Sequence, residues 1–236
     1  MFTLHNGDCL PYMKSLPDKA FDLIVTDPPY GLGIAGNPVR QKFERKDWDN
    51  ATPEKEVFEQ MFRVSKNQII WGGNYYPLPP HKNYLVWDKF QPEKFTLAMC
   101  EMAWTSFDMP AKIFRYSVQR EGANIHPTQK PVSLMKWCIA KFAETGQSIF
   151  DPFMGSGTTG VAALELGLSF IGCEISAEYF AIAEKRLQQA VLSPSFFTPS
   201  NNRLHMDAGD SPRQPSQSTL EGFTPAEQGT TPAPRQ

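Results

Sequence analysis

The sequence predicts an α/β fold in which a mostly parallel sheet carries helices on both faces. Short runs of apolar, often β-branched residues alternate with longer segments of helical periodicity, the pattern of parallel strands joined by crossover helices. Two of the short runs end in unusual turns, one proline-rich at 27–30 and one glycine-rich at 155–160. Because open α/β sheets bind ligands at the carboxyl ends of their strands, both turns are candidate ligand sites.

Local patterns define the individual elements. Two prolines cannot donate to a sheet ladder, so the chain must leave the sheet at Asp27. Pro53 and Pro131 suit the first turn of a helix, and Ser176 suits a helix cap. The predicted strands are 1–5, 21–26, 67–71, 83–88, 99–106, 147–152 and 168–174, with a weaker one at 113–118. The predicted helices are one after residue 8, 53–65, 131–146, one opened by the glycine-rich turn, and 177–191.

The chain of 236 residues fits one domain with a short appendage. The domain is predicted at 1–192, and the segment 193–236, rich in Pro, Ser, Thr and Gln, is predicted to be a disordered tail. No apolar run approaches the roughly 18 residues of a membrane span, and the first residues lack the layout of a signal peptide. A cytoplasmic protein without membrane contact is therefore expected.

The cysteines, histidines and charges exclude some classes of site. Four cysteines and four histidines are scattered without metal-ligand spacing, so no metal site is predicted. A net charge of −2 is not typical of a general nucleic-acid binder. Two segments, 37–46 and 111–130, are nevertheless basic, and each alone is more typical of a solvated loop. Their basic residues include Arg40, Lys42, Arg45, Lys46, Lys112, Arg115 and Arg120.

The glycine-rich turn indicates a nucleoside-containing cofactor. Gly155, Gly157 and Gly160 fit the G-x-G-x-x-G pattern between a strand and a helix, and Glu174 ends the next strand, where it can hold a ribose. A standard dinucleotide fold begins with this unit, whereas here it comes last. The order of the two halves of the sheet is therefore rotated.

Taken together, the two turns resemble those of the β-class DNA amino-methyltransferases, which use S-adenosylmethionine. The resemblance rests on TDPPYG (26–31), HPTQKP (126–131) and DPFMGSGTTG (151–160) in this order, and it extends over about residues 5–190. It implies a Rossmann-like methyltransferase fold with a permuted, mostly parallel seven-stranded sheet. It also implies a link to restriction–modification, and the compact size resembles phage or prophage enzymes.

The resemblance implies a set of cofactor contacts. Phe153, Gly155 and Gly157 would lie against the methionine portion, Glu174 would bind the ribose and Ile175 would flank the adenine. Asp8 would reach the adenine amino group, although it equally suits a helix N-cap. The remaining implied contacts are Asp27 at the transfer point and Thr128, Gln129 and Lys130 near the cofactor carboxylate.

The proline-rich turn suits an acceptor amine. Asp27 can accept one N–H of an exocyclic amine and the Pro28 carbonyl the other, which aims the nitrogen lone pair at the methyl group. Pro29 helps to fix that carbonyl, and Tyr30 offers a ring for stacking a base. An Asp of ordinary pKa is too weak to deprotonate the neutral amine, so it would stabilise the nitrogen as it becomes cationic.

The resulting prediction is methylation of adenine N6 in double-stranded DNA, with the base flipped out of the helix. Cytosine N4 stays open, since Asp27 could also hold that amine. An NAD-dependent oxidoreductase and a DNA-binding protein without catalysis are more distant alternatives. The two basic segments flank the proposed site in the sequence, so their basic residues given above are predicted to contact DNA phosphates. The loops 31–52 and 107–125 are predicted to read DNA; because they are short, a short or relaxed target, or help from a homodimer partner, is expected.

Overall fold

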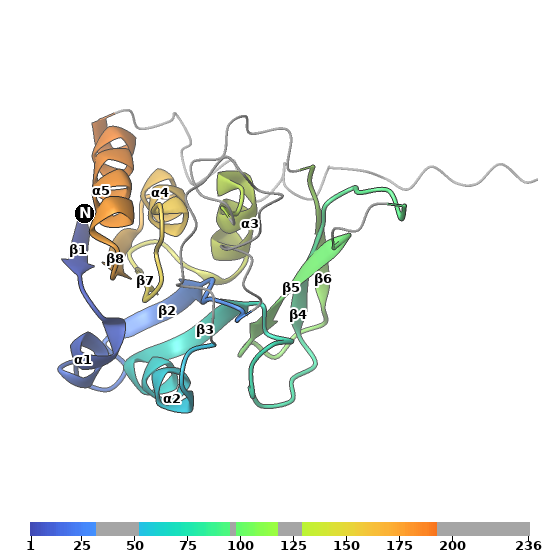
Figure 1. Ribbon diagram of the computed structural model, residues 1–236, viewed down its shortest axis with the longest axis horizontal. Coiled ribbons are helices and arrows are strands. Elements are labelled where there is room, and N and C mark those ends of the chain that lie inside the picture. Colours follow the sequence, from blue (N-terminus) through green and yellow to red (C-terminus); the bar gives the residue numbers. More distant parts are fainter. Residues whose placement is uncertain (32–51, 95–97, 118–128, 193–236) are drawn as a thin grey trace, which may run out of the picture. The chain divides into compact units, whose positions relative to one another are not determined.

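The computed structural model of the chain describes residues 1–31, 52–94, 98–117 and 129–192 (Figure 1). The predicted tail lies outside the described residues, and its disorder stays a prediction. The elements, in chain order, are β1 (Phe2–Asn6), α1 (Cys9–Lys14), β2 (Phe21–Thr26), α2 (Lys55–Val64), β3 (Ser65–Trp71), β4 (Tyr84–Asp88), β5 (Cys100–Thr105), β6 (Lys112–Arg115), α3 (Val132–Phe142), β7 (Ser148–Asp151), α4 (Thr158–Glu165), β8 (Ser169–Glu174) and α5 (Ala177–Leu192).

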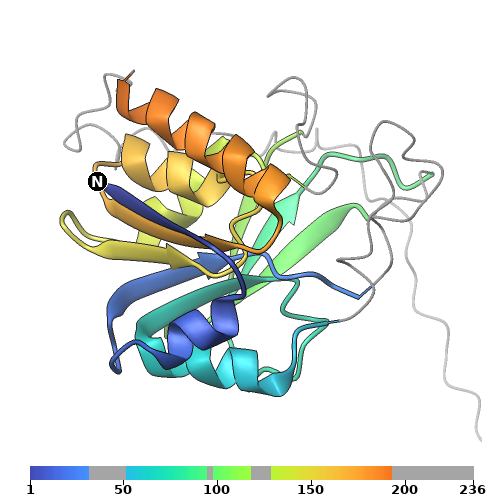
Figure 2. The same cartoon turned by 60° about the vertical axis from the view of Figure 1, so that its left-hand side comes forward.

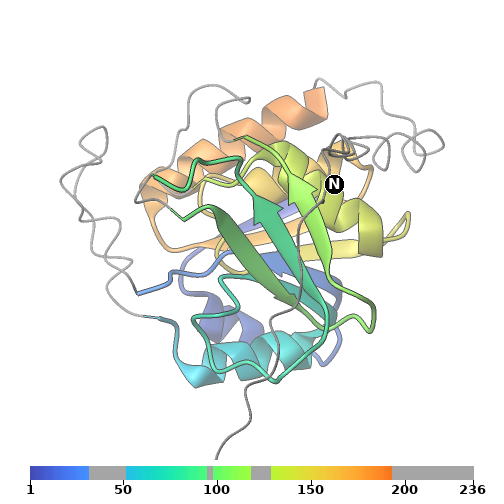
Figure 3. The same ribbon diagram turned by 90° about the vertical axis from the view of Figure 1, so that its right-hand side faces the viewer.

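The strands form one eight-stranded sheet in the order β1-β8-β7-β2-β3-β5-β4-β6. The first five strands of this order are mutually parallel. β5 runs antiparallel to both of its neighbours, and β6 is parallel to β4, so β5 alone of these strands is reversed. The strands β4, β5 and β6 lie nearest the viewer in Figure 3. The predicted fold class is confirmed, but the sheet has eight strands because the weak run near residue 113 adds the edge strand β6.

Helices cover both faces of the sheet (Figures 1 and 2). α3, α4 and α5 pack on one face over a core that includes Leu23, Phe170 and Leu187. α1 and α2 pack on the other, where Met61 of α2 and Phe150 of β7 are fully buried. The predicted helical spacing of α2 is confirmed, since its buried residues recur at one face; α2 then passes directly into β3 without a loop.

The chain reverses its direction of travel across the sheet between β7 and β2. From β7 it continues through α4 to β8 on one side, and from β2 it continues through α2 to β3 on the other. The two strands pair directly, with Leu23 opposite Ile149. A crevice forms where neighbouring connections leave in opposite directions, and ligands bind there. Both unusual turns begin at this point, one after β2 and the other after β7.

Two expected absences concern the described part of the chain only. No helix within 1–31, 52–94, 98–117 or 129–192 combines the length and apolar character that a membrane span needs. Within the same ranges, no three His, Cys, Asp or Glu side chains form a group that could hold a metal ion.

Candidate active site

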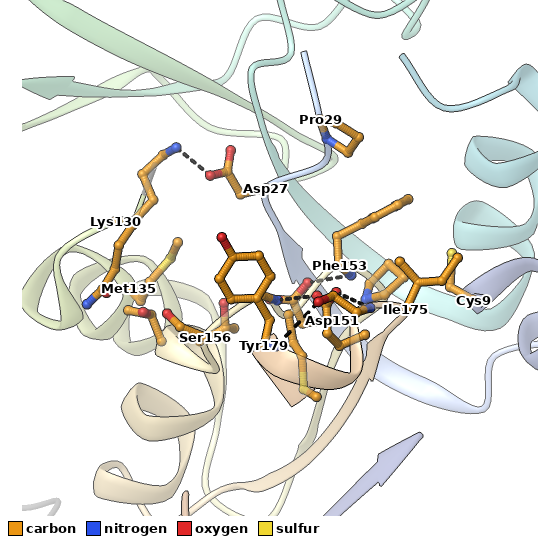
Figure 4. A pocket seen from close by; sticks show the side chains of 18 of the residues that line it. Cys9, Asp27, Pro29, Lys130, Met135, Asp151, Phe153, Ser156, Ile175 and Tyr179 are labelled. Atoms are coloured by element: carbon orange, nitrogen blue, oxygen red, sulfur yellow. Dashed lines mark hydrogen bonds and ion pairs between the residues drawn. The ribbon is translucent and has the colours of Figure 1, made fainter. Parts of the chain in front are cut away.

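A pocket of about 410 Å³ lies at the carboxyl ends of β1, β2, β7 and β8 (Figure 4). It brings together the start of α1, the turn after β2, the start of α3 and the glycine-rich turn. Among the described residues, the predicted site residues that line it are Asp8, Asp27, Pro29, Gln129, Lys130, Phe153, Gly155, Glu174 and Ile175. Further lining residues that the sequence did not indicate include Cys9, Met135, Asp151, Ser156, Thr159 and Tyr179.

Glu174 holds the glycine-rich turn in shape. Its Oε2 accepts a hydrogen bond from the Gly155 N–H at 3.0 Å, and its Oε1 accepts one from the Ser176 N–H at 2.8 Å. Each carboxylate oxygen has a further lone pair that can accept a hydrogen bond from a hydroxyl group. Ile175 follows at the rim with 71% of its surface exposed. An acid and an exposed apolar side chain therefore stand side by side at the turn, while their predicted contacts with a ribose and an adenine stay predictions.

Gly157 serves packing more than ligand contact. It is the N-cap of α4 with φ +80°, and it is not among the described lining residues of the pocket. A Cβ at Gly157 would lie 2.7 Å from Leu187 Cδ1 and 3.2 Å from Ala183 Cα, both on α5. The missing side chain lets α4 and α5 approach, so the predicted contact of Gly157 with a cofactor has no direct support in this geometry.

Gly157→Ala is expected to destabilise the fold by about 2–3 kcal/mol, because left-handed backbone strain adds to the clash with α5. Gly155→Ala is the matched control: its φ is +52°, but a Cβ there meets nothing within 4 Å. It is expected to lose only the strain, about 1 kcal/mol. Urea unfolding of the two variants measures the difference, and equal losses would contradict the packing role.

The pocket wall is acidic. Its described titratable carboxyl groups are Asp8, Asp27, Asp151 and Glu174, against one lysine, Lys130. Asp151 is fully buried, and its desolvation raises the pKa of the carboxyl to about 7, although hydrogen bonds from Thr26 and Thr159 oppose the rise. The remaining wall is largely apolar. Such a pocket suits a ligand that joins apolar groups to a positive charge.

Asp8 is a helix cap that also lines the pocket, and its contact with the cofactor adenine stays a prediction. Its Oδ1 accepts a hydrogen bond from the Leu10 N–H at 2.9 Å, which makes it the N-cap of α1. It also lines the pocket. The helix cap fixes the carboxylate at the pocket wall, so the two interpretations do not compete.

The turn after β2 is held from two sides. Thr26 donates a hydrogen bond from Oγ1 to Asp151 Oδ1 at 2.7 Å, which links the two strand ends. The buried Tyr76 hydroxyl donates to the Pro28 carbonyl at 2.7 Å. That carbonyl has a second lone pair, so it can still accept an N–H from a ligand. Tyr76 therefore aims the carbonyl, a role that the sequence did not indicate.

The Tyr30 ring is already partly packed. It stacks on Tyr75 with 4.9 Å between centroids, and a Cβ at Gly72 would come within 2.2 Å of it. Its hydroxyl donates to Asp27 Oδ1 at 2.6 Å. Stacking of a base on Tyr30 stays a prediction; the structure shows in addition that Tyr30 orients Asp27.

Lys130 is buried at the centre of an ionic cluster. Its Nζ lies 2.5 Å from Asp27 Oδ2, 2.9 Å from Glu101 Oε2 and 3.1 Å from the Tyr30 hydroxyl. An ammonium has three N–H donors, so these three acceptors can use all of them. The predicted contact of Lys130 with a cofactor carboxylate would therefore compete with this cluster. Figure 4 shows Lys130 directed at Asp27.

The pKa of Asp27 corrects one expectation. Burial raises it above the ordinary value of an aspartate, while Lys130 opposes the rise and Glu101 adds to it. The sequence-based assumption of an ordinary pKa is therefore wrong, because the turn is withdrawn from water. A raised pKa makes Asp27 a better proton acceptor than a solvated aspartate, although it remains far too weak to deprotonate a neutral amine.

Several predicted DNA contacts cannot be placed. Lys112 and Arg115 lie on the edge strand β6, and Arg115 pairs with Asp88 at 3.5 Å. Residues 32–51 and 118–125 of the two predicted DNA-reading loops lie outside the described residues. The same holds for Arg40, Lys42, Arg45, Lys46 and Arg120, and for Thr128 of the predicted cofactor site.

Comparison with known proteins places this geometry in a family. The family described as DNA methylase matches residues 70–185. A protein of Escherichia coli K12 that carries the name methylase YubD is 30% identical over 82% of this chain and 96% of its own length. The chain belongs to the DNA methylase family. This methylase is one of the S-adenosylmethionine-dependent enzymes that methylate N6 or N4 amino groups of DNA, as the two turns predicted.

Further relatives and solved structures agree with the fold. The methylase is 25% identical to the type II methyltransferase M.HinfI of Haemophilus influenzae over 82% of this chain and 70% of that protein. The complex of M1.HpyAVI with S-adenosylmethionine superposes with a TM-score of 0.56 at 22% identity, covering 79% of this chain and all of the other. The cytosine-N4-specific PvuII DNA methyltransferase gives 0.55 at 17% identity, covering 78% and 86%.

Proposed function

We propose that this methylase transfers a methyl group from S-adenosylmethionine to the N6 amine of an adenine flipped out of double-stranded DNA. The observation that carries the proposal is the turn after β2. There a largely buried carboxylate, that of Asp27 with 19% of its side chain exposed, and the Pro28 carbonyl, held by Tyr76, stand at the acidic pocket. Two fixed acceptors can take the two N–H groups of one exocyclic amine.

The pocket fits the cofactor. S-adenosylmethionine supplies a methyl group that is activated by a positively charged sulfur. Glu174 would hold the ribose, Ile175 the adenine face, and Phe153 the methionine portion. The acidic wall suits the positive charge, while the apolar remainder keeps water from the reacting atoms.

The transfer follows from how the turn holds the amine. The lone pair of an aromatic amine is delocalised into the ring, and hydrogen bonds to Asp27 and the Pro28 carbonyl draw the nitrogen toward a tetrahedral shape. Bound S-adenosylmethionine would supply its methyl group to this lone pair, and the electrons of the C–S bond would return to its sulfur. The nitrogen becomes cationic beside the Asp27 carboxylate. It then loses one proton, which Asp27 can accept because the methylated ammonium is far more acidic than the neutral amine.

Cytosine N4 methylation is the second candidate. The PvuII enzyme, which shares the fold, is specific for cytosine N4, and the turn could hold either exocyclic amine. Asp27 in the turn favours adenine through the resemblance described above. Lys112 and Arg115 on β6, with the basic residues of the loops 31–52 and 107–125, would contact the phosphates of the DNA.

Analysis of methylated nucleosides tests the acceptor. DNA from a host without methyltransferases is incubated with the methylase and labelled S-adenosylmethionine, digested and separated. The expected product is N6-methyl-2′-deoxyadenosine. N4-methyl-2′-deoxycytidine would establish the second candidate, and label in neither nucleoside would refute methylation of DNA amines by this chain.

A further inference from the structure

The cluster around Lys130 extends beyond the residues that border the pocket. Glu101 of β5 also contacts Lys130, and Lys89, just after β4, forms an ion pair with Glu101. The four side chains are 4% to 23% exposed, so the charges lie largely away from water. Glu101 is not among the described residues that line the pocket.

One ammonium is thus divided between two carboxylates. If Lys130 served Asp27 alone, the two charges would cancel, and little negative charge would remain to stabilise a cation forming on the substrate. Glu101 draws Lys130 toward itself at 2.9 Å and carries a second cation, Lys89, on its other oxygen. Two lysines and two carboxylates make the cluster neutral as a whole, while Asp27 shares its cation.

We propose that Glu101 is a positioning residue for methyl transfer: by sharing Lys130, it leaves Asp27 with negative charge to stabilise the target nitrogen. The inference rests on the proposed function, because it concerns the acceptor half of that site. It adds a residue on β5, which lies two strands away from β2 in the sheet, with β3 between them.

The electrostatics of the cluster agree with this role. Burial alone would raise the pKa of the Glu101 carboxyl, but Lys130 and Lys89 lower it to about 2, so Glu101 stays ionised through the range in which Asp27 titrates. The groups that face Asp27 are Lys130, Tyr30, Glu101 and the buried Asp151 of β7. Of these, Glu101 is a permanent negative charge that raises the pKa of Asp27 without touching the pocket.

Glu101→Gln tests the inference. At saturating DNA and cofactor, kcat is expected to fall at least about tenfold, because Lys130 then pairs with Asp27 alone. The acidic limb of the pH profile of kcat is expected to move to lower pH, since loss of the neighbouring negative charge lowers the pKa of Asp27. The dissociation constant for S-adenosylmethionine should change by no more than about twofold, because the cofactor pocket is untouched.

Glu165→Gln is the matched control. Glu165 on α4 pairs with Lys136 on α3, both half-buried, and neither lines the described pocket. Its variant should keep the kcat and the acidic limb of the wild type. Two outcomes would show that Glu101 has only a structural role and would overturn the inference. One is a loss of kcat in Glu101→Gln without a shift in the acidic limb of the pH profile, and the other is an equal loss of kcat in Glu165→Gln.

A double variant separates sharing from net charge. The variant with both Glu101→Gln and Lys89→Met has a neutral cluster again, but Lys130 still pairs with Asp27 alone, so kcat should stay low. Recovery of kcat to the wild-type value would contradict the proposal that Glu101 acts by sharing Lys130.

Glu101→Asp keeps the negative charge and should recover part of kcat. Thermal unfolding of each variant shows whether it is folded. Absence of methylation by the wild type would refute the proposed function, whereas an active wild type and an unchanged Glu101→Gln would refute this inference alone.

Discussion

Asp27→Ala is expected to lower kcat for DNA methylation by about 10²–10³-fold. The variant loses the acceptor for one N–H of the amine and the negative charge beside the nitrogen that becomes cationic. It also leaves the Lys130 ammonium, 2.5 Å from Asp27 in the wild type, next to that nitrogen with Glu101 as its remaining carboxylate. Single-turnover transfer of labelled methyl to DNA measures the effect.

Two further variants distinguish a loss of catalysis in Asp27→Ala from a loss of folding. Asp22→Ala removes a carboxylate from the opposite end of the same strand, where it pairs with Lys66, and should keep wild-type activity. Asp27→Ala with Lys130→Met removes a buried anion and a buried cation together, which avoids an unpaired buried charge. It should be folded and inactive. Full activity of Asp27→Ala would exclude the assigned role of Asp27.

Glu174→Ala is expected to weaken the binding of S-adenosylmethionine by about 10–100-fold. A hydrogen bond to a charged group contributes about 1.5–3 kcal/mol, and the variant loses the ribose contact together with the two backbone hydrogen bonds that shape the turn. Calorimetric titration of the cofactor into the protein measures the change.

Glu178→Ala is the control for charge, since Glu178 is exposed in the first turn of α5 and does not line the described pocket. It should bind the cofactor as the wild type does. An unchanged affinity in Glu174→Ala would place the ribose elsewhere. Tight binding of NAD without binding of S-adenosylmethionine would contradict the cofactor assignment as a whole.

The sequence predicted those parts of the site that depend on a strand and the turn that follows it. Asp27 and Gly155 stand directly after buried strands, and strand ends of a parallel sheet meet at one edge. Asp151 follows the same rule, as an acid before a proline at the end of a strand. It could have been identified as the counterpart of Asp27.

Other parts depend on contacts between segments far apart in the sequence. Tyr76 reaches Pro28 from the segment after β3, and Glu101 reaches Lys130 from β5. Their sequence surroundings are typical of an ordinary strand and loop, so only the packed sheet shows that they meet at the turn after β2. The raised pKa of Asp27 has the same origin, because it arises from burial that no local pattern reveals.

The pairing of β2 with β7 also determines when the site is completed during synthesis. Phe2 lies opposite Phe170 and Leu23 opposite Ile149, so β1 and β2 can pair with β8 and β7 only after more than a hundred further residues have been synthesised. Until then, β2 has an unpaired edge on the side where β7 will bind. The turn proposed to hold the acceptor amine is therefore made well before the strand that encloses it.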